Sequence, residues 1–151
     1  MFVEYSTTVD ARLPVVEKSL DRVRGSLEAL AHVVYREGEQ LRARVGPSPA
    51  VAREVTLEIG IGEIHTVGLV YPISWTATEA TVLFPRLDAD LILSKAGPGR
   101  TSLTLRGTYE PPLGTLGRLA DRAGLRLVAE ATVADWMERL ASALTADVVV
   151  S

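Results

Sequence analysis

Residues 111–145 read PPLGTLGRLADRAGLRLVAEATVADWMERLASALT, and their pattern is the strongest indication of the fold class. Two prolines before regularly spaced apolar residues predict one long helix, because proline is favoured in the first turn of a helix. The expected apolar stripe recurs at intervals of three, four or seven residues and comprises Leu116, Ala120, Ala123, Leu127, Ala131, Ala134, Ala141 and Leu144. We expect residues 146–151 to form a frayed tail.

Further apolar residues widen the buried arc of this helix beyond a narrow seam. They are Leu119, Leu125, Val128, Val133, Trp136 and Leu140. A helix with so wide an apolar arc should be buried on more than one side, and a helix cradled by a curved sheet meets that requirement.

The chain before this helix alternates between apolar and polar residues with a period of two, which predicts β-strands. The expected strands span residues 2–10, 41–45, 55–61, 67–77, 87–93 and 103–109. Their apolar residues fall at odd-numbered positions, so the strands should share one apolar face. Residues 96–99, Ala-Gly-Pro-Gly, predict a hairpin, while Pro72 and the run Gly60–His65 predict a bulge, a turn or an edge.

Helical spacing interrupts the strands only near the N-terminus. Pro14, Val16, Leu20 and Val23 predict a helix directly after the first strand, which should break at residues 25–26. A second short helix is expected over residues 27–38, because its apolar residues recur at intervals of three and four.

Length and composition exclude several classes of function. The 151 residues suit a single domain spanning 1–151, and the absence of cysteine excludes disulfides, thiol nucleophiles and cysteine–metal sites. A net charge of −3 disfavours nucleic acid as a partner. The sequence begins without a basic, apolar secretion signal and has no apolar run long enough to span a membrane, so we expect a cytoplasmic location.

The order of strand, two short helices, antiparallel strands and long C-terminal helix resembles the START and Bet v 1-like (SRPBCC) superfamily, which includes polyketide cyclases. The resemblance covers nearly the whole chain. Its most characteristic segments are Leu83-Phe84-Pro85, Asp88-Ala89-Asp90, residues 109–114 (YEPPLG) and Leu116-Gly117-Arg118, which are similar to those of uncharacterised bacterial members. The resemblance implies an α+β helix-grip fold. In this fold, six to seven antiparallel strands curve around the C-terminal helix, and two short helices follow the first strand.

The same resemblance implies a cavity between the sheet and the helix that holds a hydrophobic small molecule, although it supplies no catalytic motif. The expected lining residues combine apolar side chains with a few phenols and one indole, as ligand pockets do. They are Tyr5, Leu69, Tyr71, Ile73, Trp75, Leu91, Leu103, Leu105, Tyr109, Leu116, Ala120 and Leu127. His65 is expected either as a polar contact at the mouth of the cavity or as a structural histidine.

Three functions follow as alternatives. The first is binding or carriage of a lipid-, polyketide- or aromatic-like molecule. The second is a cyclase- or dehydrase-type enzyme, which the sequence weakens because the apolar face offers only tyrosines and His65 for proton transfer. The third is a co-chaperone-like interaction module. We expect no cofactor, because two histidines without cysteine make a poor metal site. A hydrophobic small molecule is the expected partner, and a homodimer stays open.

Overall fold

The computed structural model describes residues 2–24, 55–77, 86–110 and 122–150. The elements in chain order are β1 (Phe2–Val9), α1 (Leu13–Val23), β2 (Val55–Ile59), β3 (Glu63–His65), β4 (Gly68–Ala77), β5 (Arg86–Lys95), β6 (Thr101–Glu110) and α3 (Arg122–Val150). The helix expected over residues 27–38, the strand expected over 41–45 and the expected first turns of the long helix over 111–121 lie outside the described residues.

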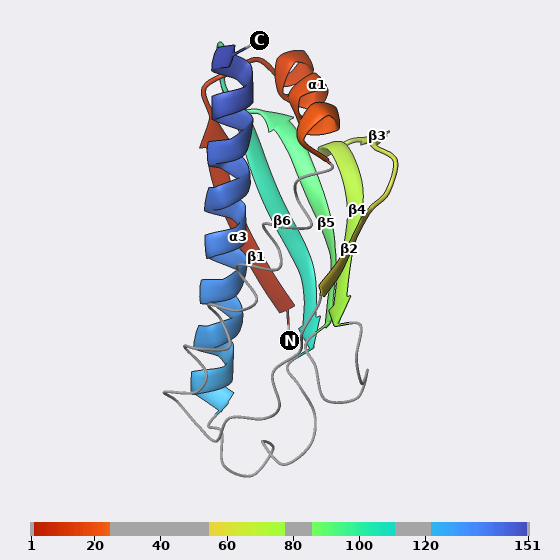
Figure 1. Cartoon of the computed structure of the whole chain (residues 1–151), viewed down its shortest axis with the longest axis vertical. Helices are drawn as coiled ribbons and strands as arrows, with labels where there is room; N and C mark the ends of the chain where they lie inside the picture. Colours follow the sequence, from red (N-terminus) through yellow and green to blue (C-terminus); the bar gives the residue numbers. More distant parts are fainter. Residues whose placement is uncertain (1, 25–54, 78–85, 111–121, 151) are drawn as a thin grey trace.

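The described strands form one antiparallel sheet of six strands in the order β1-β6-β5-β4-β2, with β3 also paired to β4. The long helix α3 runs along one face of the sheet, and α1 lies across one end of it (Figure 1). The architecture is therefore the expected helix-grip-like α+β fold. No described helix is both long and apolar enough to span a lipid bilayer.

The strand register confirms the predicted apolar face. Tyr5, Leu105, Leu91 and Tyr71 are paired in one row across the sheet, so their side chains point to the same side. Parallel rows join Leu69, Leu93 and Leu103, and join Trp75, Leu87 and Tyr109. Leu87, Leu91, Leu93, Leu103 and Leu105 are all fully buried. Burying each such side chain contributes about 1.5–3 kcal/mol relative to leaving it in water.

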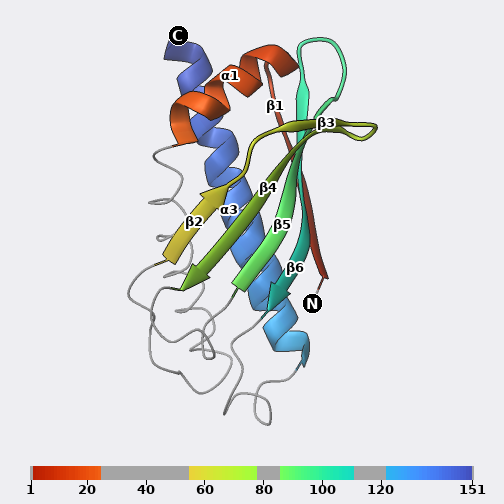
Figure 2. The ribbon, with the colours of Figure 1, turned by 90° about the vertical axis from the view of Figure 1, so that its right-hand side faces the viewer.

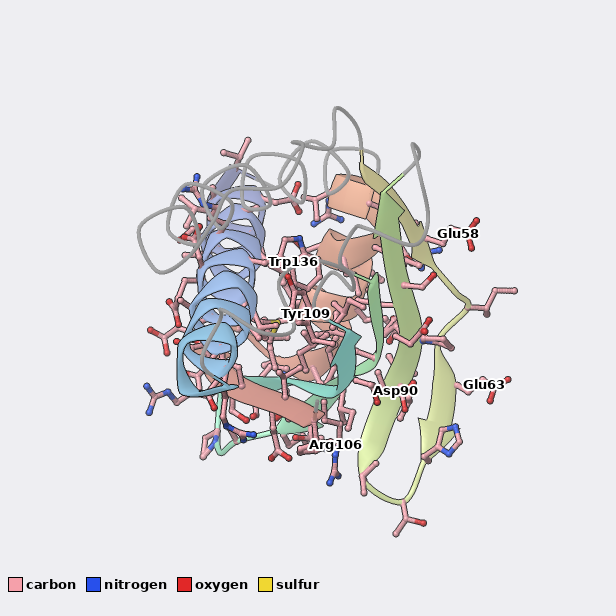
Figure 3. All side chains as sticks on the ribbon, turned by 90° about the horizontal axis from the view of Figure 1, so that it is seen from below. Glu58, Glu63, Asp90, Arg106, Tyr109 and Trp136 are labelled. Atoms are coloured by element: carbon pink, nitrogen blue, oxygen red, sulfur yellow. The ribbon has the colours of Figure 1, made fainter. Side chains whose placement is uncertain are left out.

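Strands β5 and β6 approach each other closely at Gly107. Gly107 pairs with Ala89, and a Cβ atom at Gly107 would lie only 2.4 Å from Ala89 Cα and 2.3 Å from the Asp88 carbonyl oxygen. No residue larger than glycine fits this approach without moving a strand. Viewed along the strands, the β1–β6 and β4–β2 parts of the sheet meet at an angle that faces α3 (Figure 3).

A bulge divides the opposite edge of the sheet into β2 and β3. Residues 60–62 lie opposite residues 71–72 of β4, so the edge carries one residue more than its partner strand. The Gly60 N–H donates to the Pro72 carbonyl oxygen at 2.7 Å. Proline has no N–H to donate, and a bulge is where a strand tolerates that loss. The structure thus confirms a bulge both for Pro72 and for the run Gly60–His65.

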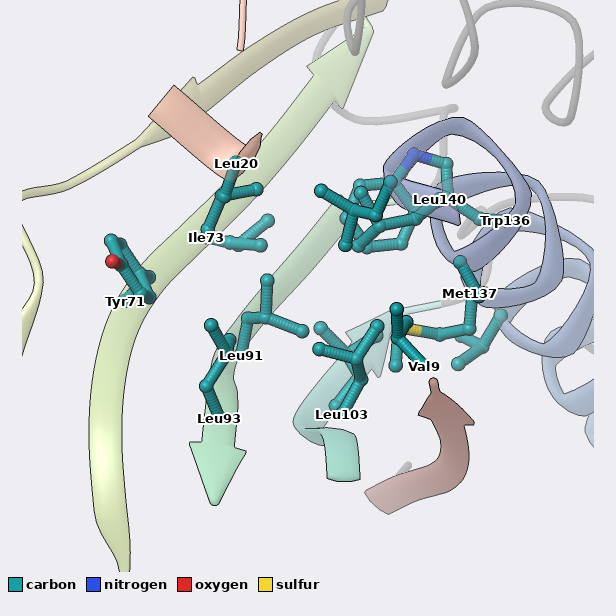
Figure 4. Packing of buried hydrophobic residues seen from close by; sticks show 14 of the residues in the cluster. Val9, Leu20, Tyr71, Ile73, Leu91, Leu93, Leu103, Trp136, Met137 and Leu140 are labelled. Atoms are coloured by element: carbon teal, nitrogen blue, oxygen red, sulfur yellow. The ribbon is translucent and has the colours of Figure 1, made fainter. Parts of the chain in front are cut away.

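The buried side of α3 differs in part from the predicted stripe. Its most buried residues are Ala129, Val133, Trp136, Met137, Leu140, Ala141 and Leu144. Ala131 and Ala134, which were expected in the centre of the stripe, are only half-buried. Val133, Trp136 and Leu140, which were expected only to widen the arc, are among the most buried residues, because the larger Trp136 and Leu140 gain more from burial than alanine does. Figure 4 shows Met137 of α3 beside Val9, while Trp136 and Leu140 extend from the same helix into the cluster.

The expected frayed tail is wrong, because α3 continues to Val150. The Asp147 carboxylate accepts hydrogen bonds from the Ser19 hydroxyl at 2.7 Å and from Arg22 Nε at 2.9 Å. Val148 packs against the hydrophobic core. These contacts stabilise a helix end that would otherwise fray. Local periodicity could not predict them, because Ser19 and Asp147 are over 120 residues apart.

Candidate functional site

Most of the predicted lining residues lie together in one hydrophobic cluster between the sheet and α3. Tyr71, Ile73, Leu91, Leu103, Leu105 and Tyr109 are buried members, while Tyr5 and Leu69 are partly buried at its margin. Trp75 occupies the row of Leu87 and Tyr109, and Leu127 lies within α3, although the side chains of both fall outside the description. Leu116 and Ala120 lie outside the described residues.

The cluster is filled with side chains at the end where α1 lies. Leu20 and Val16 of α1 and Leu144 of α3 are fully buried there, alongside Leu93 and Leu103 of the sheet. Leu93, Leu103 and Leu144 therefore pack as ordinary core, since all three are fully buried.

Two polar-tipped aromatic residues distinguish the other half of the cluster. Tyr109 is 5% exposed on β6, and Trp136 is fully buried on α3. Both appear in the space between α3 and the sheet when the molecule is viewed from the end opposite α1 (Figure 3). A buried phenol and indole each bring one polar atom into an apolar environment, which is how ligand pockets orient an otherwise apolar guest.

Tyr71 lies at the edge of the cluster, beneath the end of α1. Burial raises the pKa of its hydroxyl to about 12, and the carboxylates of Glu17 and Asp21 add to the rise while Arg24 opposes it. The Arg24 guanidinium carbon lies 6.0 Å from the centre of the Tyr71 ring. The phenol is thus neutral at ordinary pH and can exchange hydrogen bonds, although it is a poor general base.

Arg24 and Gly62 fix the position of this ring. Arg24 donates to the carbonyl oxygens of Ile59 at 3.3 Å and of Gly60 at 3.4 Å, which ties the end of α1 to the bulge. A Cβ atom at Gly62 would lie 2.7 Å from Tyr71 Cε1. Glycine at position 62 therefore makes room for the phenol. In Figure 4 the Tyr71 hydroxyl points away from α3.

Tyr5 lies on the seam between β1 and α3 rather than deep in the cluster. Its hydroxyl donates to Glu138 Oε1 at 2.6 Å. This hydrogen bond to a carboxylate, with smaller effects of desolvation and of the same charge, raises the pKa of the Tyr5 hydroxyl. This hydrogen bond connects α3 to β1.

His65 lies on the opposite face of the sheet from the cluster. A two-residue turn at 66–67 follows it, and it pairs with Gly68, whose neighbour Leu69 faces inward. Its Nε2 lies 3.4 Å from Glu63 Oε2, and its side chain is 51% exposed. Its odd number does not place it with the inward residues, because the turn breaks the alternation that joined it to Leu69.

The outer face of the sheet carries an open depression of about 760 Å³. Glu58, Asp88, Asp90 and Arg106 line it around Pro72. Asp88 and Asp90 are exposed. Among the described residues, no three histidine or acidic side chains come together in a way that could hold a metal ion.

The expected lining omitted several fully buried residues of the cluster, among them Trp136 and Met137. The predicted contribution of the long helix rested on Leu116, Ala120 and Leu127, in its earlier turns. The signal for Trp136 was its spacing of three from Val133 and four from Leu140, which a count of the largest apolar residues would have favoured.

Comparison with known proteins gives a likeness of fold. A solved structure from Thermus thermophilus is 18% identical, with a TM-score of 0.46 over 99% of this chain and 98% of that one. A hypothetical protein of Helicobacter pylori is 9% identical, with a TM-score of 0.46 over 94% and 86% of the two chains. The Zhui aromatase/cyclase of a Streptomyces species is 15% identical, with a TM-score of 0.40 over 99% and 92%. No protein-family model and no curated protein matches this chain.

Proposed function

We propose that this protein binds a hydrophobic small molecule between the curved sheet and α3. The observation that carries the proposal is the pair Tyr109 and Trp136, two polar-tipped aromatic residues buried in one apolar cluster on opposing elements. Tyr109 and Trp136 lie in the half of the cluster that is farther from α1. Affinity would come from burial of apolar ligand surface, at roughly 25 cal/mol per Å².

Binding fits the inward side chains better than catalysis does. In the described part of the chain, the buried polar residues are Ser19 and Thr101, and the ionisable members of the cluster are tyrosines. Ser19 and Thr101 are engaged with Asp147 and with the Ala11 carbonyl oxygen. A cyclase-type reaction needs a group that gives or takes a proton near neutral pH, and a phenol with a pKa of about 12, such as Tyr71, does neither efficiently.

Native mass spectrometry of the freshly purified chain, repeated after denaturation, tests the proposal first. Extra mass that is released on denaturation would support binding and identify the class of ligand. The chain is then titrated with the naphthalene dye ANS, and binding is followed by dye fluorescence. A clean mass together with no saturable ANS binding would refute the proposal.

Variants locate the site. Replacing Trp75 with alanine or Tyr109 with phenylalanine should weaken binding while the fold is retained, because both residues lie in the same row of the sheet. Loss of one hydroxyl hydrogen bond corresponds to roughly 0.5–1.5 kcal/mol, or about a two- to tenfold loss of affinity. Tyr5→Phe is the matched control, since it also deletes one hydroxyl but that hydroxyl is bound to exposed Glu138. Equal effects of both Tyr→Phe changes would contradict the assignment.

A further inference from the structure

A basic pocket opens between the start of α1 and the hairpin that joins β5 to β6. Both elements lie at the same end of the sheet (Figure 2). Arg12, Lys95 and Arg100 line the pocket together with Gly97 and Gly99. Its volume of about 240 Å³ is below the 300–1,000 Å³ of typical sites for drug-sized molecules. It equals roughly eight water molecules of liquid, which suits a compact oxyanion.

The pocket carries more positive than negative side-chain charge. Arg100 Nε donates to Asp10 Oδ1 at 3.1 Å, which leaves the other donors of its guanidinium available. Within the described part of the chain, Arg12 and Lys95 form no ion pair and no side-chain hydrogen bond. The chain as a whole carries a net charge of −3, so this concentration of positive charge runs against its average.

The backbone around the pocket is held in place from both sides. The hydroxyl of fully buried Thr101 donates to the Ala11 carbonyl oxygen at 2.7 Å, which fixes the chain next to Arg12. The Ala96 N–H donates to the Arg100 carbonyl oxygen at 3.1 Å and closes the hairpin. Cations on a fixed backbone lose less conformational freedom when they bind a ligand.

The hairpin glycines and the start of α1 also favour the binding of an anion in this pocket. Gly97 and Gly99 have φ angles of +125° and +69°, and a Cβ atom at either would meet nothing within 4 Å, so a ligand can approach this backbone closely. The first turn of α1 has no acidic residue, and its partial positive charge adds to that of the side chains.

We propose that this pocket binds a phosphate-type dianion through Arg12, Lys95 and Arg100. The dianion would be either a free phosphate or phosphomonoester or the headgroup of an acidic lipid, because the charged chemistry is the same. The site is independent of the hydrophobic cluster, since its three cations are exposed and lie outside that cluster. A failure to bind hydrophobic ligands would therefore leave this proposal intact.

The test is a titration of the full chain with inorganic phosphate against chloride at constant ionic strength, followed by the amide NMR signals of Gly97 and Gly99. We expect saturable shifts, and a loss of affinity of roughly tenfold or more in Arg12→Ala and in Lys95→Ala, as for one charged hydrogen bond. Lys18→Ala removes an exposed cation of α1 outside the pocket and is the matched control. Constant ionic strength removes general screening as a cause.

Vesicles of phosphatidylcholine with and without phosphatidic acid distinguish the source of the phosphate group. Saturable binding of free phosphate supports a soluble ligand, whereas binding only to vesicles that contain phosphatidic acid, lost in Lys95→Ala, supports a lipid headgroup. Absence of both, or an equal loss in Lys18→Ala, would overturn the proposal. Because Arg12 and Lys95 are exposed, their replacement should leave the circular dichroism spectrum unchanged.

Discussion

Replacing Gly107 with alanine should destabilise the protein far more than its size suggests. The new Cβ atom would lie 2.3 Å from the Asp88 carbonyl oxygen and 2.6 Å from Ala89 Cβ. Ordinary van der Waals contact begins at 3.4 Å, so β6 must move from β5 by about 1 Å. Overpacking typically costs about 1–3 kcal/mol, and the upper end applies here because two of the three nearest atoms are paired backbone.

Urea unfolding followed by circular dichroism measures this loss as a fall in the midpoint at an unchanged m-value. For a chain of this length, about 3 kcal/mol corresponds to a fall in Tm of roughly 6–12 °C. Gly99→Ala is the control, since its Cβ meets open space and only its φ of +69° is unfavourable. That variant should lose only about 1–2 kcal/mol. If Gly107→Ala is as stable as Gly99→Ala or more stable, β5 and β6 do not approach each other as closely at position 107 as described.

Three further predictions concern the core and two titrating groups. Leu91→Ala should lower the free energy of unfolding by about 3–5 kcal/mol, because the side chain is fully buried, and a loss below 1 kcal/mol would contradict the packing. Hydrogen bonds from Arg22 and Ser19 lower the pKa of Asp147, so its contribution is present above the unfolded value near 3.9 and is lost as pH falls through the lower folded value. In Asp147→Asn, the free energy of unfolding should therefore depend less on pH in the acid range. Tyr71 should ionise near pH 12, so stability should fall from about pH 10 to 12, and Tyr71→Phe should reduce that fall and remove one late-titrating phenol from the absorbance titration.

The inward face of the sheet could be predicted from sequence because alternation is a local property. Each side chain in a strand points opposite to its neighbours, so Leu91, Leu103 and Leu105 were placed on one face before their pairing was known. The hairpin at residues 96–99 and the bulge beside Pro72 were predictable for a similar reason, since glycine and proline restrict the backbone locally.

The side of α3 that faces the sheet needed the tertiary structure. A helix with apolar residues almost all around offers several stripes, and only packing against β1 and β6 selects the one centred on Trp136 and Leu140. His65 shows the same limit, since a two-residue turn moved it to the outer face although its number matched the inward residues.

Periodicity and composition were enough to predict the order of the described elements other than the short strand β3, the shared face of the strands and the apolar character of the interior. Three features emerged only when the elements packed together: the close approach of Gly107 to β5, the hydrogen bonds of Asp147 to α1 and the pocket that brings Arg12 together with Lys95 and Arg100. Each of these joins residues far apart in the chain. Such contacts depend on how the elements pack, and no local pattern of residues encodes that packing.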